Sequence, residues 1–355
     1  MDSLIVMKGL LIAAFLVILV PGSLRAEGFR EITKDHTLHF PADFYYREGY
    51  RLQWWYFTGH LFTAGGREFG YELTFFVAGV QRKRSKSQFQ VHNIYISHFA
   101  VSDVAGNSYS SFDRADSGAY GFAGSDDSRL HVWVDDNQLT GTTTEMTLRA
   151  SGGDKTIDLR LVPVTPVVLN GDKGYSRKSE ESSGIASWYF SYPDMRTEGT
   201  LAIGDAEFAV TGKSWFDREI SSGTMGKNEK GWDWFSLQLD DGREAMLYLM
   251  RKKDGTYDRY SSGTFVYADG RYRHLALGDF GIAVQGHYTS KKTGAVYPSG
   301  WRVTIPSEGL DLNITPLIRD QEFVASSSTG THYWEGDCRV SGSADGRAYV
   351  ELTGY

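Results

Sequence analysis

The chain has 355 residues, of which 41% are hydrophobic and 23% charged, so it can form packed cores and lacks the composition of a disordered protein. Its 40 glycines, 21 tyrosines, 20 phenylalanines and nine tryptophans, against eight prolines, favour strands over helices. The net charge of −7, without a long Lys/Arg block, argues against nucleic acid as a partner.

The N-terminal segment differs from the rest of the chain. Residues 9–20 form an apolar run that follows a lysine and ends at a Pro-Gly pair, and Ala26 offers a cleavage site. The run is too short to span a membrane, which takes about 20 residues. We predict a signal peptide over residues 1–26, a periplasmic or secreted mature protein, and no transmembrane domain after cleavage. The single cysteine, Cys338, cannot form an intrachain disulfide.

The remaining chain repeats itself in four blocks that recur in the same order. Such order predicts a tandem duplication, with one copy at about 52–215 and a shorter one at about 231–355, joined by residues 216–230. We therefore expect an N-terminal domain of residues 27–220 and a C-terminal domain of residues 221–355. The paired blocks are 53–61 with 232–239, 157–163 with 310–316, 198–199 with 335–336, and 211–212 with 353–354.

Apolar and polar residues alternate within each copy, and Gly-containing turns separate the runs, as in half-buried strands. There is no long amphipathic helical pattern, so we predict an all-β protein made of two barrels in tandem. A barrel of this kind can enclose an apolar small-molecule ligand. Residues 170–183 are polar, rich in Gly and Ser, and lack a counterpart in the second copy, which predicts a loop that could serve as a lid.

The candidate chemistry lies in residues 214–219. In an extended strand Asp217 and Glu219 share a face, directly beside the aromatic residues Trp215 and Phe216. Apolar surroundings raise the pKa of a carboxyl, and a protonated carboxyl is the acid that alkene protonation or leaving-group departure requires. The alternative is an ion-pair network, including Arg218, that fixes the join between the copies.

Aromatic residues supply the candidate ligand site. Four consecutive aromatic residues at 54–57 must face both sides of a strand. Two of them could line a cavity while the other two pack outside it, or all four could be ordinary core residues. His60 could be a polar group in the cavity or a core histidine. No signature of a serine hydrolase, a nucleotide enzyme or a metal site is present, so we expect no cofactor and no metal. The expected ligand-binding residues are Trp54, Tyr56, His60, Trp188, Tyr189, Trp215, Trp232 and Trp234.

Five motifs span nearly all of the predicted mature chain: residues 54–61 (WWYFTGHL), 174–178 (GYSRK), 212–219 (GKSWFDRE), 231–236 (GWDWFS) and 349–355 (YVELTGY). In these motifs the sequence resembles the AttH/CrtC family of lipocalin-like predicted secreted hydrolases, which includes carotenoid 1,2-hydratase (hydroxyneurosporene synthase). The resemblance implies two tandem lipocalin-like β-barrels of the calycin type.

In the hydratase branch, the resemblance implies that an Asp in a Tyr-Trp-Asp motif protonates an isolated double bond and that water captures the resulting carbocation. Asp217 occupies that position, but Trp215 and Phe216 replace the Tyr and the Trp, and Gln53 stands where the first motif usually has Glu. These departures, and the expected export, argue against a pigment hydratase.

Three hypotheses follow. The first is an exported enzyme that acts on an apolar isoprenoid or lipid, with Asp217 as general acid and Glu219 as its partner or water-orienting base. The second is a non-catalytic carrier of the same ligands. The third is a hydrolase, for which no nucleophile with a paired base is visible in the sequence.

Overall fold

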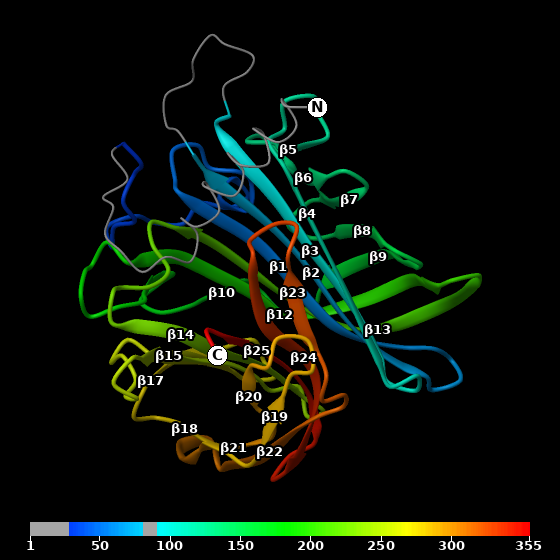
Figure 1. The fold of residues 1–355 in the computed structure, drawn as a ribbon. Helices are drawn as coiled ribbons and strands as arrows, with labels where there is room; N and C mark the ends of the chain where they lie inside the picture. Colours follow the sequence, from blue (N-terminus) through cyan, green and yellow to red (C-terminus); the bar gives the residue numbers. More distant parts are fainter. Residues whose placement is uncertain (1–27, 81–90) are drawn as a thin grey trace.

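The computed structural model describes residues 28–80 and 91–355, so the predicted signal peptide lies outside the described residues. The N-terminal half forms one antiparallel sheet and the C-terminal half another (Figure 1). The N-terminal strands are β1 (Leu52–Phe62), β2 (Glu68–Gly79), β3 (Asn93–Asp103), β4 (Ser108–Asp116), β5 (Ala123–Ser125), β6 (Leu130–Val134), β7 (Asn137–Gly141), β8 (Met146–Gly152), β9 (Lys155–Pro163), β10 (Val168–Leu169), β11 (Tyr175–Arg177), β12 (Ala186–Ile203) and β13 (Ala206–Ser221).

The C-terminal half contains twelve strands, two of which form a small separate hairpin. The helical segments of the described chain are two 3₁₀ turns, η1 (Ala42–Phe44) and η2 (Pro306–Glu308). The strands are β14 (Glu229–Leu239), β15 (Glu244–Lys252), β16 (Ser262–Val266), β17 (Tyr272–Ala276), β18 (Gly281–Val284), β19 (His287–Thr289), β20 (Val296–Pro298), β21 (Trp301–Ile305), β22 (Leu310–Pro316), β23 (Glu322–Ala325), β24 (Thr331–Gly342) and β25 (Gly346–Thr353), of which β19 and β20 form the hairpin.

The two sheets share one topology. Strands run in the order β4-β3-β2-β1-β13-β12-β9-β8-β7-β6-β5 in the first sheet and β17-β16-β15-β14-β25-β24-β22-β21-β18 in the second. Each sheet thus has its first hairpins on one side and its last strand paired with its first. The all-β fold with two barrel-like sheets is confirmed, although only the C-terminal sheet curls into a nearly closed barrel, while the N-terminal sheet is a half-barrel (Figure 1).

The strand pairing corrects half of the sequence alignment between the copies. The first two blocks fall on equivalent strands, β1 with β14 and β9 with β22. The dipeptides do not: Gly199 pairs with Leu159 as Gly342 pairs with Leu312, so residue 342, not residue 336, matches Gly199. The expected linker is also too long at its start, because β13 continues to Ser221 and β14 begins at Glu229.

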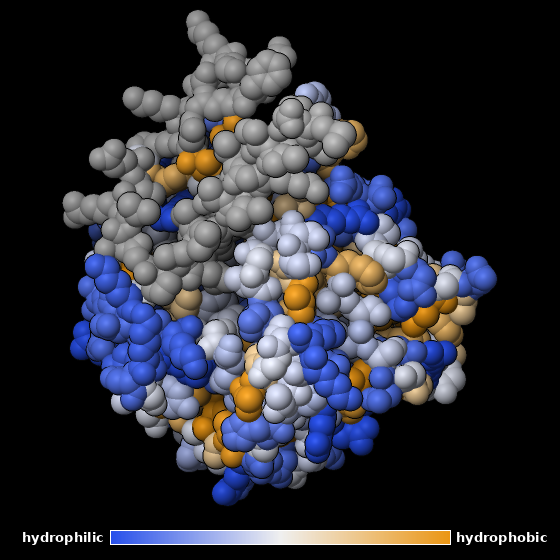
Figure 2. Space-filling model, in the orientation of Figure 1, coloured by the Kyte–Doolittle hydropathy of each residue, from blue (hydrophilic) through white to orange (hydrophobic). Residues whose placement is uncertain are grey.

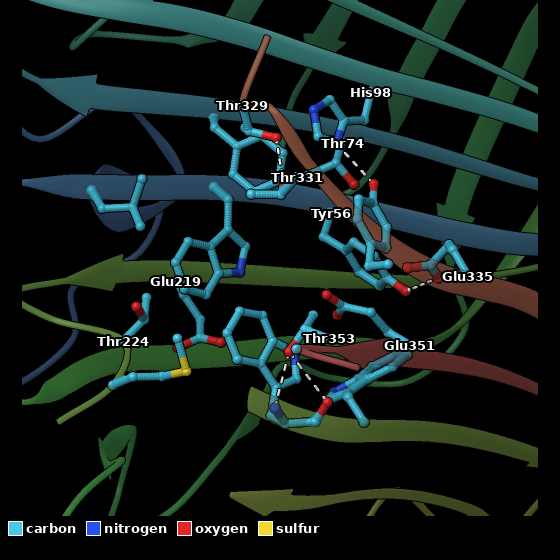
Figure 3. A pocket seen from close by; sticks show the side chains of 18 of the residues that line it. Tyr56, Thr74, His98, Glu219, Thr224, Thr329, Thr331, Glu335, Glu351 and Thr353 are labelled. Atoms are coloured by element: carbon cyan, nitrogen blue, oxygen red, sulfur yellow. Dashed lines mark hydrogen bonds between the residues drawn. The ribbon is translucent and has the colours of Figure 1, made fainter. Parts of the chain in front are cut away.

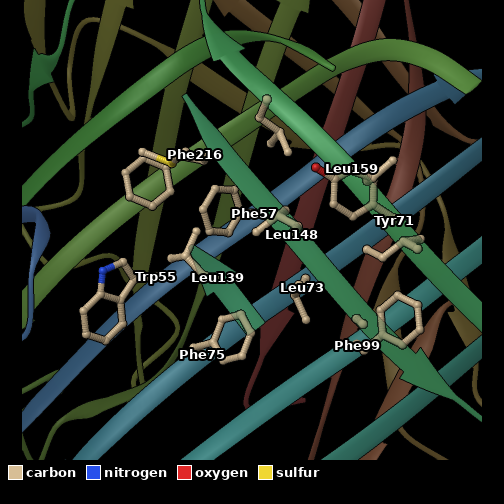
Figure 4. Packing of buried hydrophobic residues seen from close by; sticks show 14 of the residues in the cluster. Trp55, Phe57, Tyr71, Leu73, Phe75, Phe99, Leu139, Leu148, Leu159 and Phe216 are labelled. Atoms are coloured by element: carbon tan, nitrogen blue, oxygen red, sulfur yellow. The ribbon is translucent and has the colours of Figure 1, made fainter. Parts of the chain in front are cut away.

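Each sheet fills its own concave side with side chains. Trp55, Phe57 and Leu73 belong to the N-terminal core (Figure 4), and Phe235 and Trp301 to the C-terminal core. Because side chains alternate along a strand, the other face of β1, β13 and β14 carries Tyr56, Trp215 and Trp234, among others, into a third cluster where the sheets meet. The interiors of the two sheets are filled by these cores, and the third cluster lies outside them.

The joint between the halves is extended by a hairpin of the C-terminal half. Strands β23 and β24 reach across to β3 and β4, where Phe323 and Tyr333 pack with Ala100. The imidazole of His98 stacks on the Phe323 ring with centroids 4.6 Å apart. Polar residues cover most of the visible C-terminal half in Figure 2, with apolar residues scattered among them. Within residues 28–80 and 91–355, no helix is long and apolar enough to cross a membrane.

Candidate functional site

A cavity of about 400 Å³ lies between the two sheets, at the third cluster (Figure 3). Its walls come from β1, β2, β3 and β13 on one side and from β14, β15, β24 and β25 on the other. Much of the cavity wall is aromatic. The Trp, Tyr and Phe side chains that line it are Trp54, Tyr56, Phe76, Tyr189, Trp232, Trp234, Tyr248, Tyr333 and Tyr355. The combination of aromatic walls with a few polar groups is typical of small-molecule sites.

Asp217 lies in this cavity as a buried carboxyl with three hydrogen-bond donors. The Tyr189 hydroxyl donates to Oδ2, and the Ser191 hydroxyl and the Trp215 indole N–H donate to Oδ1, the latter at 2.7 Å. Trp234 in turn donates its indole N–H to the Tyr189 oxygen at 3.1 Å. Burial raises the pKa of Asp217 to about 7, against the three hydrogen bonds, which lower it. The group therefore changes protonation state near neutral pH.

Glu219, two residues further along β13, is held differently. Its Oε2 accepts a hydrogen bond from the Ser187 hydroxyl and lies 3.1 Å from the Lys178 ammonium. That ammonium also sits 4.7 Å from the centroids of the Tyr189 and Tyr248 rings. Burial disfavours the charge of Lys178, but Glu219, Tyr248 and Asp217 together outweigh it and the pKa of Lys178 is raised. Glu219 is thus one half of a buried ion pair.

Lys178 comes from the segment that the sequence predicts to be a loop. Residues 175–177 form β11, which pairs with β12, so the loop prediction is wrong for this part. Beyond it, the Ser179 hydroxyl donates to Glu229 at 2.8 Å and the Arg177 guanidinium to the Tyr260 hydroxyl at 2.7 Å. The segment is fastened to both halves of the protein and supplies a cation to the cavity.

A further carboxyl, Glu351 of β25, faces the cavity from the C-terminal sheet. Figure 3 shows its side chain between Glu219 and Glu335. Burial raises the pKa of Glu351 to about 7; a hydrogen bond from Trp232 opposes this shift, and the charges of Glu219 and Asp217 add to it. Unlike Asp217, it is only partly covered, so its surface borders the open space.

Two more acids, Glu72 and Glu335, line another part of the wall. The Tyr56 hydroxyl donates to Oε1 of Glu335 at 2.7 Å, and the Thr74 hydroxyl to Oε1 of Glu72 at 2.8 Å. Burial raises the pKa of Glu72 to about 8 and that of Glu335 well above its ordinary value. Glu72 is therefore mainly a neutral acid at pH 7, and in the described chain the second oxygens of both carboxyls accept no hydrogen bond.

A serine–histidine contact at the edge of the site bears on the hydrolase hypothesis. His98 Nε2 lies 3.0 Å from the Ser328 hydroxyl, and its Nδ1 lies 2.8 Å from the Tyr333 hydroxyl. Burial, however, lowers the pKa of His98 to about 3, which makes it a weak base at neutral pH. Ser328 is itself buried and does not line the cavity. The geometry therefore gives this pair no nucleophilic role.

The structure brings together most, but not all, of the site residues expected from sequence. Trp215 packs behind the wall and reaches the site through Asp217. Trp188 is in a separate cluster, stacked on His36 at 3.6 Å, and His60 is bound to Asp337 at 2.8 Å in the joint between the sheets. Those expected residues that do line the cavity are Trp54, Tyr56, Tyr189, Asp217, Glu219, Trp232 and Trp234.

Five cavity residues with carboxyl or amino side chains are absent from the expected set: Glu72, Lys178, Lys230, Glu335 and Glu351. Lys178, Glu335 and Glu351 lie in the repeat blocks or family-like motifs, which was the signal available in the sequence. Within the described ranges, no group of three or more His, Cys, Asp or Glu side chains has the arrangement of a metal site.

Comparison with known proteins places this geometry in a family. Residues 31–355 match the AttH-like family model. The fold is similar to that of an AttH protein of Nitrosomonas europaea, at 31% identity and a TM-score of 0.84, covering 92% of this chain and 100% of that one. It is also similar to kievitone hydratase of Nectria haematococca, at 17% identity and a TM-score of 0.70, covering 92% and 95% of the two chains. No curated protein matches the sequence. The chain belongs to the AttH-like family.

Proposed function

We propose that this protein is a hydro-lyase that adds water across an isolated carbon–carbon double bond of an apolar isoprenoid or lipid held between the two sheets. The observation that carries the proposal is Asp217, a buried carboxyl with a pKa of about 7 in an aromatic cavity. The similarity to kievitone hydratase, a protein of the same fold, agrees with this reaction class.

The surroundings of Asp217 suit a group that gives up a proton during the reaction. The protonated form transfers its proton to an alkene carbon, and a carbocation forms on the ligand. The Tyr189, Ser191 and Trp215 donors then stabilise the new carboxylate, so they act on charge that develops during the step. The faces of Tyr56 and Trp234 can stabilise the cation.

The test uses a panel of acyclic compounds with isolated double bonds: geraniol, geranylgeraniol, squalene and lycopene. Each is incubated with the protein in water enriched in oxygen-18, and the products are analysed by mass spectrometry. We expect a product that carries one labelled oxygen, and a loss of about 100-fold or more in rate for Asp217→Asn. Asp311→Asn, in an exposed pair with Arg302, is the matched control and should keep the wild-type rate. Equal rates for wild type and Asp217→Asn would refute the role of Asp217.

A carrier function is the second candidate, and one observation favours it. Both oxygens of Asp217 are already hydrogen-bonded within the protein, so the carboxyl is satisfied without a ligand. A carrier would bind panel compounds, as measured by quenching of tryptophan fluorescence, and release them unlabelled. For either function we propose export to the periplasm or the exterior, supported by the composition of residues 1–26 and tested by N-terminal sequencing of the native protein.

A further inference from the structure

The duplication places a carboxyl at the same position in both sheets. Asp217 pairs with Tyr56 across β13 and β1, and Glu351 pairs with Trp234 across β25 and β14. Tyr56 and Trp234 occupy equivalent positions in the repeated blocks. Asp217 and Glu351 are therefore counterparts that face the same cavity from opposite halves of the chain.

The two carboxyls also have similar partners. Each has an indole side chain that favours its charged form: Trp215 donates its N–H to Asp217 at 2.7 Å, and Trp232 lowers the pKa of Glu351. Glu219 differs from both, because its Oε2 is bound by the Lys178 ammonium and the Ser187 hydroxyl. The other titratable side chains that line the cavity are Tyr56, Glu72, His98, Lys178, Tyr189, Glu219, Lys230, Tyr248, His332, Tyr333, Glu335 and Tyr355.

We propose that Glu351, rather than Glu219, is the second carboxyl of the reaction: it shares one proton with Asp217 across the cavity and takes a proton from the water that adds to the ligand. This inference rests on the proposed function. Two buried carboxyls within electrostatic reach do not readily ionise together, so one is protonated while the other is a carboxylate. The charges of Glu219 and Asp217 both raise the pKa of Glu351.

The proposed reaction cycle balances in atoms and in charge. Protonated Asp217 gives its proton to one alkene carbon, and the π electrons form the new C–H bond and leave a cation on the other carbon. Water adds to that cation and loses a proton to the Glu351 carboxylate. The product is the alcohol, Asp217 is now ionised and Glu351 protonated, and transfer of one proton from Glu351 to Asp217 through solvent restores the starting state.

The first test needs no substrate. Protein labelled with carbon-13 at the Asp and Glu side-chain carboxyls is titrated by NMR, with signals assigned from Asp217→Asn and Glu351→Gln. If the two groups share a proton, each variant lowers the titration midpoint of the remaining carboxyl by about half a pH unit or more. Glu244→Gln serves as control, because Glu244 is a buried carboxyl with a pKa raised to about 8 outside the cavity. Midpoints that stay unchanged in both cavity variants would overturn the shared proton.

The second test uses whichever panel compound the wild type hydrates. Glu351→Gln keeps the size and polarity of the side chain and should lose about 100-fold or more in kcat, together with the acidic limb of the pH–rate profile. Glu351→Asp, which keeps a titratable group, should recover part of the rate and that limb. A melting temperature close to the wild-type value shows that each variant is folded.

The outcomes separate the inference from the proposed function. If Asp217→Asn abolishes hydration while Glu351→Gln leaves rate and pH profile intact, the function stands and the role of Glu351 is refuted. If the wild type hydrates no compound of the panel, the function and the role of Glu351 in water addition both fail, and the NMR midpoints alone decide the proton-sharing pair.

Discussion

Replacing Asp217 by Asn should change stability with a sign that depends on pH. The folded protein holds the Asp217 proton up to about pH 7, whereas the unfolded chain releases it near the ordinary value of 3.8. Between these values the folded state binds more protons, so its stability falls as pH rises, and the full penalty is present above pH 7. A shift of this size corresponds to about 4 kcal/mol.

Asn carries no charge, so the variant escapes this penalty but makes poorer hydrogen bonds. Its amide can still accept from Ser191 and Trp215, while the Tyr189 hydroxyl loses an acceptor at a cost of about 1–3 kcal/mol. We therefore expect Asp217→Asn to be less stable than wild type at pH 4 and more stable at pH 8.5.

Urea unfolding at a series of pH values between these limits measures the difference directly. Asp311→Asn is the control, because the Arg302 partner lowers the pKa of that exposed carboxyl. This variant should not gain stability relative to wild type as the pH rises. A difference for Asp217→Asn that does not vary with pH, or that favours wild type increasingly as pH rises, would refute the reasoning.

Three further predictions concern the joint, the cavity and the strands. His60→Ala leaves the buried Asp337 carboxyl without its partner and should lower the free energy of unfolding by about 3–5 kcal/mol in urea titrations; an unchanged midpoint would show that this pair does not hold the sheets. Trp232→Ala should weaken binding of the neutral dye Nile red about tenfold, measured by fluorescence titration, because it removes part of the cavity wall. In Gly59→Ala the new methyl would lie 2.4 Å from the Tyr71 ring, so thermal melting should show a loss of about 1–3 kcal/mol, and a wild-type melting temperature would contradict the tight packing there.

The alternation of residues was sufficient to predict the strands and the division of the aromatic block. Trp55 and Phe57 entered a core, and Trp54 and Tyr56 the cavity, as a period of two requires. The same rule shows why Trp188 was misplaced. It is adjacent to Tyr189 in β12, so the two side chains point to opposite faces and cannot both line one cavity.

The location of the cavity and its carboxyls could not be read in this way. Both faces of β1 and β14 are buried, and the sequence pattern does not say which face meets its own sheet's core and which meets the other half. Glu72 and Glu351 are single acids in separate strands, 279 positions apart. They enter one site only because the sheets pack against each other, which is a long-range property of the fold.

The position of the cavity at the joint links assembly of the protein to its protons. The acids that line it owe their high pKa values to burial that exists only while the two halves are in contact. Separating the halves would let water in, and at neutral pH the acids would then ionise and release protons. Closing the joint therefore takes up protons, so mild acidity tightens the contact between the halves, and the same protons that serve the chemistry help to hold the molecule together.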